Sequence, residues 1–454
     1  MPDNDRMHST DLTNTERAVA VAFASGSELD VTGRPDPYVR AAALRYILLG
    51  GVTAEPGDRT GLRLSGARVG GALEVDFTDV DAPVTLTGCT FDGPISFFGS
   101  HLRRLDLAGS EFPKFDVGNA TIDGTVVLRG CRSTGLVSLG GAMIGGSLLM
   151  GGALLTGTGI AFDGTALRVR RDLLADGGFT CRGAFRLDRA EIGGVLSLER
   201  AVLDGSGDAE SLRTADVAGG GLDDGEWSTS VAFSGRHLTT RELILLPERR
   251  PGGLVDLRHA RIGLLRDTPE TWPPGLRLDG LTYEAVTDLE GRDARLSWLR
   301  LDPGNFRPQP YAHLAQVYRA AGRDDDARTV LLDGERHRRG KLSRAGRWWG
   351  QLQDLTVGYG YRPVRAALWL AVLFIAGAVV FGLNPPRAAE PAKAPEFVAP
   401  VYALDLLLPV GDFGQQSAYH PRGATAWLAY ALIVAGLILT TTVAAAVTRR
   451  LRRA

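Results

Sequence analysis

An apolar ladder that repeats every ten or eleven residues constrains this chain more than any other feature. A large apolar residue is followed three positions later by a small residue, and two positions beyond that by another apolar residue. A helical face needs steps of three and four, whereas here apolar residues two apart are interrupted by Gly-Gly or Asp-Gly corners. The ladder therefore predicts short strands that turn at glycines. Its triplets are Leu64, Ala67, Val69; Val75, Thr78, Val80; Leu86, Cys89, Phe91; Phe97, Ser100, Leu102; Leu107, Ser110, Phe112; Val117, Ala120, Ile122; Leu139, Ala142, Ile144; Met150, Ala153, Leu155; Leu187, Ala190, Ile192; Leu198, Ala201, Leu203; and Leu257, Ala260, Ile262.

A fixed period of this kind predicts a mainly β solenoid, in which each coil buries its inward residues against the coils on either side. The repeats imply coils of ~20 to 22 residues. With coils stacked ~4.8 Å apart, a run from about residue 57 to about residue 290 would make a rod roughly 50 Å long.

The small-x-large pattern resembles that of the pentapeptide-repeat proteins. Ala67-Arg68-Val69, Cys89-Thr90-Phe91 and Ala190-Glu191-Ile192 carry the resemblance. It implies a right-handed, four-sided β-helix with these residues on the inside of its faces. The chain departs from the family pattern by one extra residue in most pairs of faces, often at a Gly-Gly pair such as Gly145-Gly146.

Composition and motifs give little indication of catalysis. The net charge of −1 and the mixed outward charges argue against a nucleic-acid partner. Cys89 and Cys131 occupy the same small inward position in different coils, and Cys181 has no close partner in the sequence. We therefore expect the cysteines to serve packing and not redox chemistry, and we expect a reducing compartment. The sequence lacks His-x-x-x-His, Cys-x-x-Cys, Walker and strand-linked Gly-x-Gly-x-x-Gly motifs. We therefore predict no catalytic residue, cofactor or metal site, and lean towards a protein that is not an enzyme.

Two uncharged, mostly apolar runs near the end of the chain, residues 366–383 and 424–447, predict membrane helices. Basic residues precede the first run and follow the second, whereas the connecting loop has few. This bias predicts a two-span protein of the inner (cytoplasmic) membrane with both termini in the cytoplasm. Arg344, Arg347, Trp348 and Trp349 are candidate lipid contacts, with an ordinary topology determinant as the alternative interpretation.

The same patterns divide the chain into four parts. Residues 1–56 should form a helical cap, with helices at 15–24 and 38–49 and a first strand at 29–31. Residues 57–300 should form the β-helix. Residues 301–363 should form a helical hairpin, which resembles a single tetratricopeptide unit and would cap the open end of the solenoid, and a basic juxtamembrane helix. Residues 364–454 should form the two-helix membrane domain.

The loop between the two apolar runs holds the candidate site residues Asp405, Gly411 and Asp412. Its segment 401–409 is apolar but too short to span a membrane, and Gly-containing backbone follows it. A re-entrant pore loop has this form, and an interfacial helix packed on the spans is the favoured alternative. The string Thr356-Val357-Gly358-Tyr359-Gly360 matches a potassium selectivity filter, but it precedes both spans and so has the wrong context.

Nearly the whole chain resembles a family of bacterial proteins with a Gly-rich repeat domain and a two-span C-terminus, labelled membrane-associated oxidoreductase. The label implies redox activity, yet none of the shared motifs binds a known redox group. We interpret the chain as a scaffold or docking protein that contacts membrane lipid and a cytoplasmic protein, with a homo-oligomer left open. A two-span oligomeric channel and a redox enzyme are the alternatives. The resemblance rests on Leu257-Arg258-His259-Ala260-Arg261-Ile262-Gly263, Leu276-Arg277-Leu278-Asp279-Gly280-Leu281, Arg307-Pro308-Gln309-Pro310-Tyr311, Val357-Gly358-Tyr359-Gly360-Tyr361-Arg362-Pro363 and Leu404-Asp405-Leu406-Leu407-Leu408-Pro409.

Overall fold

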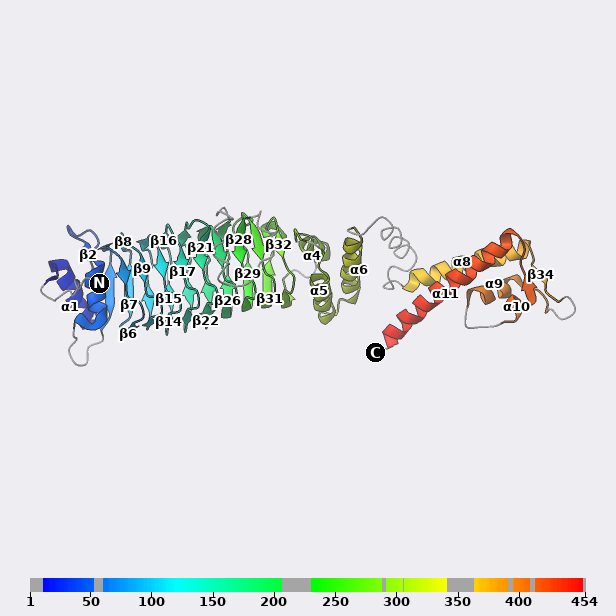
Figure 1. Ribbon diagram of the computed structural model, residues 1–454, viewed down its shortest axis with the longest axis horizontal. Coiled ribbons are helices and arrows are strands. Elements are labelled where there is room, and N and C mark those ends of the chain that lie inside the picture. The colour runs from blue at the N-terminus through cyan, green and yellow to red at the C-terminus, as the bar shows by residue number, and fades with distance from the viewer. Residues whose placement is uncertain are drawn as a thin grey trace, which may run out of the picture. The chain divides into compact units, whose positions relative to one another are not determined.

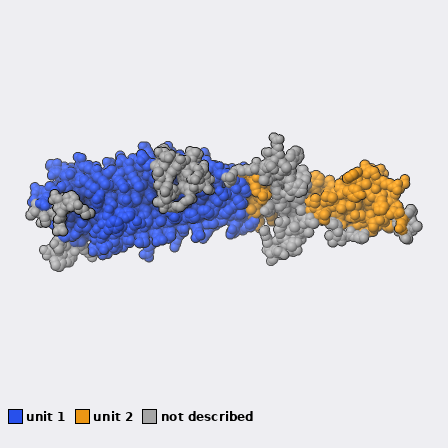
Figure 2. Space-filling view, viewed as in Figure 1, with its two compact units in different colours: residues 1–322 blue, residues 323–454 orange. Residues whose placement is uncertain are grey.

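The chain divides into two compact units, residues 1–322 and residues 323–454 (Figure 2). The computed structural model describes residues 11–52, 60–205, 230–287, 291–304, 306–340, 363–390, 395–408 and 413–451.

The first unit is mainly a β-solenoid of about nine turns (Figure 1). Each turn contributes short strands in a fixed order, and each strand pairs in parallel with the equivalent strand of the next turn. For example, β3 (Leu62–Ser65), β4 (Arg68–Gly70), β5 (Leu73–Glu74) and β6 (Asp79–Val80) make one turn. They pair respectively with β7 (Val84–Thr87), β8 (Thr90–Phe91), β9 (Ile95–Ser96) and β10 (His101–Leu102) of the next. Four stacks of strands therefore line the solenoid.

Three sheets contain these stacks. The eight-stranded sheet consists of β2 (Tyr38–Arg40), β4, β8, β12 (Glu111–Phe112), β16 (Arg132–Ser133), β20 (Leu154–Leu155), β24 (Thr180–Arg182) and β27 (Val202–Asp204). The nine-stranded sheet consists of β5, β9, β13 (Phe115–Asp116), β17 (Val137–Ser138), β21 (Ile160–Asp163), β25 (Ala184–Arg186), β28 (Val231–Ser234), β30 (Leu254–Asp256) and β32 (Leu276–Arg277). The 16-stranded sheet consists of β1 (Leu29–Asp30), β3, β7, β11 (Leu105–Asp106), β15 (Val126–Val127), β19 (Leu148–Leu149), β23 (Leu173–Leu174), β6, β10, β14 (Thr121–Ile122), β18 (Met143–Ile144), β22 (Arg168–Val169), β26 (Glu191–Ser197), β29 (Thr239–Leu245), β31 (Arg261–Asp267) and β33 (Thr282–Val286).

Coil length varies more than the repeats predict. Ile95 pairs with Phe115, 20 residues later, whereas Leu148 pairs with Leu173, 25 residues later. The 16-stranded sheet combines two of the four stacks because β26 is long enough to pair with β22 near its start and with β23 near its end. In β29, β31 and β33 the same two stacks continue as single strands.

The ladder correctly predicts which side chains face inward. Every residue of the predicted triplets is buried except Thr78, which is partly exposed. Inward serines satisfy their hydroxyls on the preceding coil: the Ser100 hydroxyl donates to the Val75 carbonyl at 2.6 Å, and that of Ser110 to the Leu86 carbonyl at 2.7 Å. Each coil is thus bound to its neighbour by apolar packing and by buried hydrogen bonds.

Left-handed backbone at the corners explains many of the glycines. The residue just before the small inward residue has a positive φ in turn after turn, for example 71° at Gly66 and 65° at Gly99. Glycine adopts this conformation without a Cβ clash, whereas an L-residue pays ~1 kcal/mol or more. Some coils nevertheless place a larger residue there, including Phe77 and Arg189.

The N-terminal segment covers the first coil. Helix α1 (Asn14–Ser25) lies where the sequence predicts a helix, and β1 pairs with β3 as a first strand. The helix expected over residues 38–49 is only partly confirmed, because Tyr38–Arg40 forms β2 and pairs with β4. Helix α2 (Ala41–Tyr46) and a π-helical turn (Ile47–Gly51) follow. Pairing with an exposed strand edge overrides the local helical pattern here, and strands of the solenoid begin before residue 57.

Helices α4 (Arg292–Leu299) and α5 (Pro308–Ala320) follow the last strands of the solenoid. The Gln309 side chain accepts from the Gly280 amide at 2.9 Å and donates to the Leu281 carbonyl at 2.9 Å. The Tyr283 amide donates to Nε2 of His313 at 2.8 Å. Side chains of α5 therefore satisfy backbone groups of the last turn that a further coil would otherwise pair.

A buried ion pair connects α4 to the last turns. Arg295 and Asp267 are each 2% exposed, and two guanidinium nitrogens donate to the two carboxylate oxygens at 2.9 and 2.7 Å. The Trp272 indole donates to the same carboxylate at 2.8 Å, and the guanidinium lies over the rings of Trp272 and Trp298. Because every charged group is partnered, the arrangement avoids the cost of an isolated buried charge.

The second unit is mainly helical. It contains α6 (Asp324–Gly340), α8 (Pro363–Leu383), α9 (Ala399–Leu407), α10 (Gln415–Ala418), α11 (Ala424–Leu451) and the antiparallel pair β34 (Arg387–Ala388) and β35 (Tyr419–His420). The two runs predicted to cross a membrane form α8 and α11, but over the described residues no helix combines the length and the apolar character that a membrane span requires.

Candidate functional site

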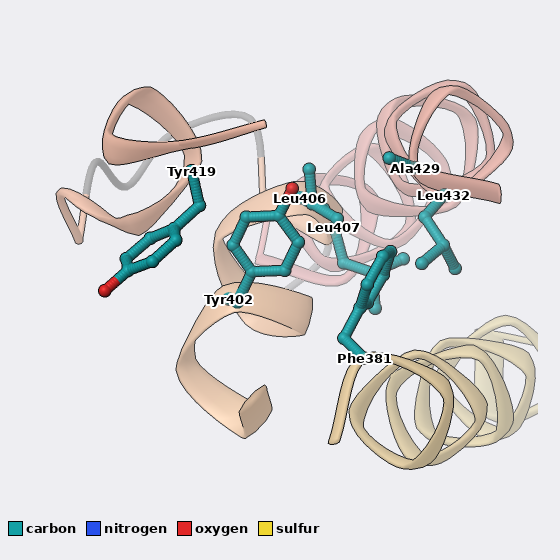
Figure 3. Packing of buried hydrophobic residues seen from close by; sticks show 7 residues of the cluster. All are labelled: Phe381, Tyr402, Leu406, Leu407, Tyr419, Ala429 and Leu432. Atoms are coloured by element: carbon teal, nitrogen blue, oxygen red, sulfur yellow. The ribbon is translucent and has the colours of Figure 1, made fainter. Parts of the chain in front are cut away.

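The candidate site in the second unit is built on α8 and α11, which pack antiparallel. Leu439, late in α11, contacts Leu370 and Leu373, early in α8. At the other end, Phe381 clusters with Ala429 and Leu432. Figure 3 shows that Tyr402, Leu406 and Leu407 of α9 complete this apolar cluster together with Tyr419.

Two glycines let α9 approach both long helices closely. A Cβ at Gly436 of α11 would lie 2.3 Å from the Leu407 carbonyl oxygen, and one at Gly377 of α8 would lie 3.2 Å from Cβ of Ala403. Rings on this side also pack edge to face, with the Phe381 and Tyr402 centroids 4.9 Å apart. The segment predicted to be re-entrant or interfacial is thus a helix packed on both α8 and α11.

Asp405 of α9 is 3% exposed and hydrogen-bonded to backbone amides. Its carboxylate accepts from the amides of Phe413, Gln415 and Gln416 at 3.1, 3.0 and 2.7 Å. The Gln415 side chain in turn donates to the Glu396 carbonyl at 2.9 Å. The carboxylate therefore holds the segment 413–416 against α9. This geometry gives Asp405 a structural role in the packing of the loop.

The outward faces of both long helices are apolar. On α8 the exposed large residues recur every three or four positions, as they do on α11, so each set lies on one helical face. Neither 368–383 nor 424–440 contains a charged residue. When a helix is apolar on its exposed face as well as on its buried face, the exposed face is typically covered by lipid or by another protein surface. The exposed residues are Leu368, Trp369, Val372, Ile375, Val379 and Leu383 on α8, and Trp427, Tyr430, Val434, Leu437 and Ile438 on α11.

The other residues singled out in the sequence lie outside the described ranges. These are Gly411 and Asp412 in the loop, Arg344, Arg347, Trp348 and Trp349 before α8, and the string 356–360. Of the predicted site residues, the structure therefore places only Asp405.

The three cysteines lie inside the solenoid and are not bonded to one another. Burial raises the pKa of Cys89 to about 11 and that of Cys131 to about 12, and it also raises that of Cys181. Thiols of this kind are largely protonated at neutral pH and therefore weak nucleophiles.

A buried acid of the solenoid, Asp188, forms a charged cluster with its neighbours. Its carboxylate accepts from the Ser234 hydroxyl at 2.5 Å, from Arg186 at 2.8 Å and from Arg236 at 2.6 Å. Burial opposes its charged form, but these donors hold the pKa of Asp188 below its usual range. All of its polar partners come from the same or the next coil, so the cluster stabilises the stacking of coils.

A shallow groove of about 700 Å³ crosses the outer side of β14, β18, β22, β26 and β29. Outward residues in register along it are Thr121, Met143, Arg168, Glu191 and Thr239. Asp123, Gly145, Arg170 and Gly193 border them. Within the described ranges, no three or more His, Cys, Asp or Glu side chains are grouped as metal ligands would be.

Comparisons of this chain with protein-family models, with curated proteins and with solved structures found no match.

Sequence reasoning missed the packing of α9 and the groove. Gly377 and Gly436, in the interior of long apolar helices, are the signal for close helix contact. The sequence gives a weaker signal for the groove. Gly145 and Gly193 occupy the position of the repeat at which neighbouring coils have Asp123 and Arg170.

Proposed function

We propose that this chain is a scaffold whose right-handed, pentapeptide-like solenoid presents a docking surface, while its C-terminal unit holds it at a lipid bilayer. The observation that carries the proposal is the pair of exposed apolar faces on α8 and α11. Water would contact these faces in an isolated monomer, at a free-energy cost that scales with the apolar area.

The residue types on these faces favour lipid over a second protein copy. Small residues, which helices use for close contact within membranes, lie against α9 at Gly377 and Gly436. The outward faces carry many large apolar residues with exposed alanines such as Ala371 and Ala431 between them, and the aromatic residues Trp369, Trp427 and Tyr430 lie near the two ends of the antiparallel pair. Aromatic residues at two levels are typical of contact with both edges of an apolar layer. The two-span topology with cytoplasmic termini stays a prediction within this proposal.

Vesicle flotation tests the lipid contact. The full chain is mixed with vesicles of phosphatidylcholine containing phosphatidylglycerol and centrifuged through a density gradient. The wild type should float, and the double variant Val372→Glu/Val434→Glu should stay in the aqueous fraction, because a carboxylate in an apolar layer is costly. Val21→Glu is the matched control, since Val21 is also an exposed valine but lies in the first unit. A wild type that stays with the aqueous fraction would refute the lipid contact.

Two further measurements address the scaffold role. Proximity labelling from the solenoid in cells should recover a consistent protein partner. Cation-selective current from reconstituted wild type would instead support the channel alternative, and a coloured purified protein would support a redox enzyme.

A further inference from the structure

The groove on the solenoid offers a binding site, and the first reason is that its shape is built into the backbone. A Cβ at Gly145 would lie 2.2 Å from the Asp123 carbonyl oxygen, and a Cβ at Gly193 would lie 2.2 Å from that of Arg170. No side chain fits at either position unless the coils move apart. The hollows on both sides of Arg170 are therefore fixed, and a ligand would find them already formed.

The second reason is an arginine of the groove that has no charged partner. Nε2 of His101 contacts the Asp123 carboxylate at 2.9 Å, and Arg168 lies 3.7 Å from Glu191. Both acids of the lining therefore have a partner, and the Asp123 carboxylate, which raises the pKa of His101 through this hydrogen bond, is neutralised when His101 is protonated. Within the described part of the chain, the exposed Arg170 side chain has no ion pair and no hydrogen bond, so one positive charge remains unpaired in the groove.

The third reason is an exposed methionine. Met143 points outward from β18 and is 45% exposed, whereas its in-register neighbours Thr121 and Arg168 are polar. Methionine adapts its shape to apolar partners and is over-represented on surfaces that bind peptides. The groove thus combines an apolar contact point with a free cation.

We propose that this groove binds an extended acidic peptide of a partner protein, with an apolar side chain over Met143 and a carboxylate beside Arg170. The inference rests on the proposed scaffold role and names the class of partner that the solenoid would hold. Because the strands of the groove are already paired in the ladder, side chains carry the recognition, and electrostatic complementarity to Arg170 sets the preference for an acid.

Fluorescence anisotropy with the full chain and three labelled peptides tests the proposal. The first peptide is Gly-Ser-Asp-Leu-Asp-Ser-Gly, the second has Lys in place of both Asp residues, and the third has Ser in place of Leu. The first should bind, and each of the others should bind about tenfold more weakly or worse. Higher salt should weaken the first further.

Two variants locate the site. Arg170→Glu should weaken the first peptide about tenfold or more, whereas Arg129→Glu, an exposed arginine away from the groove, should leave its affinity unchanged. Thermal melting by circular dichroism verifies that both variants fold. Equal affinity for the acidic and basic peptides, equal affinity of the two variants, or no binding by the wild type would overturn the proposal. Vesicle flotation of Arg170→Glu should match that of the wild type, so failure here is distinct from failure of the lipid contact.

Discussion

At the scale of single residues, stability depends on the position of each residue in the repeat. Leu107 and Val117 are fully buried, while Thr90 on a neighbouring coil is exposed. The alternation follows from the strand period of two, which sends successive side chains to opposite faces.

Leu107→Asp should therefore destabilise the solenoid by about 3 kcal/mol or more, because it buries an unpaired carboxylate between coils. Thr90→Asp introduces the same side chain on the outside and should change the stability by less than about 1 kcal/mol. Chemical denaturation followed by circular dichroism measures both. Equal midpoints would contradict the inward register.

At the scale of elements, the end of the solenoid depends on a neutral histidine. Nε2 of His313 lies 2.8 Å from the Tyr283 amide nitrogen and 2.9 Å from the Tyr283 carbonyl oxygen, and it accepts from the amide only in the neutral form in which this nitrogen carries no proton. Burial lowers the pKa of His313 below its ordinary value of 6.5, so the folded state favours the neutral form. Burial and nearby His259 lower the pKa of His237 in the same direction.

The cap should consequently loosen as the solution is acidified. The stabilisation is fully present above pH 6.5 and is lost as the pH falls through the lowered pKa of the folded state. Hydrogen exchange at the Tyr283 amide should accelerate, relative to the intrinsic rate, between pH 7.5 and about pH 5. His313→Gln keeps an acceptor without titrating and should remove most of this dependence. An unchanged profile in that variant would show that another group is responsible.

The packing of α9 permits a second prediction at this scale. Gly436→Ala places a Cβ against the Leu407 backbone, whereas Gly382→Ala meets only Cβ of Ala399 at 3.7 Å. The first should accelerate hydrogen exchange in α9 about tenfold, which corresponds to ~1.4 kcal/mol. The second should have little effect. If both variants behaved alike, α9 would not be wedged against Gly436.

These elements also show what the sequence can and cannot predict. Local periodicity was sufficient to predict the inward faces, the strands of the solenoid and α1, because burial repeats with the chain. It could not predict that Arg295 and Asp267 meet in the interior, since 28 residues separate them and charged side chains usually lie outside. It also missed that Asp405 binds backbone amides from a segment eight to eleven residues later.

At the scale of the whole molecule, the two units differ in kind. The solenoid buries its apolar residues within its own coils, whereas α8 and α11 leave many of theirs exposed. The coils of the first unit therefore cover most of its own large apolar residues, while the proposed lipid contact would cover those of the second.

Reporter fusions test the orientation that the basic residues predict. Alkaline phosphatase fused after Pro395 should be active, because the loop between the two apolar runs should face away from the cytoplasm. The same enzyme fused after Ala454 should be inactive, and a fluorescent protein fused there should fold. Phosphatase activity at Ala454 would refute the predicted orientation.

Because the coils are stacked, the length of the solenoid can change by one whole coil at a time, and the solenoid can act as a spacer. Val126 pairs with Leu148 on the next turn, so removal of residues 126–147 would join two equivalent positions of the repeat. The shortened chain would keep the segments that cover the two ends of the solenoid, and the distance between these ends would fall by ~4.8 Å. Gain or loss of whole turns in evolution would therefore adjust the distance that this protein spans without rebuilding either end.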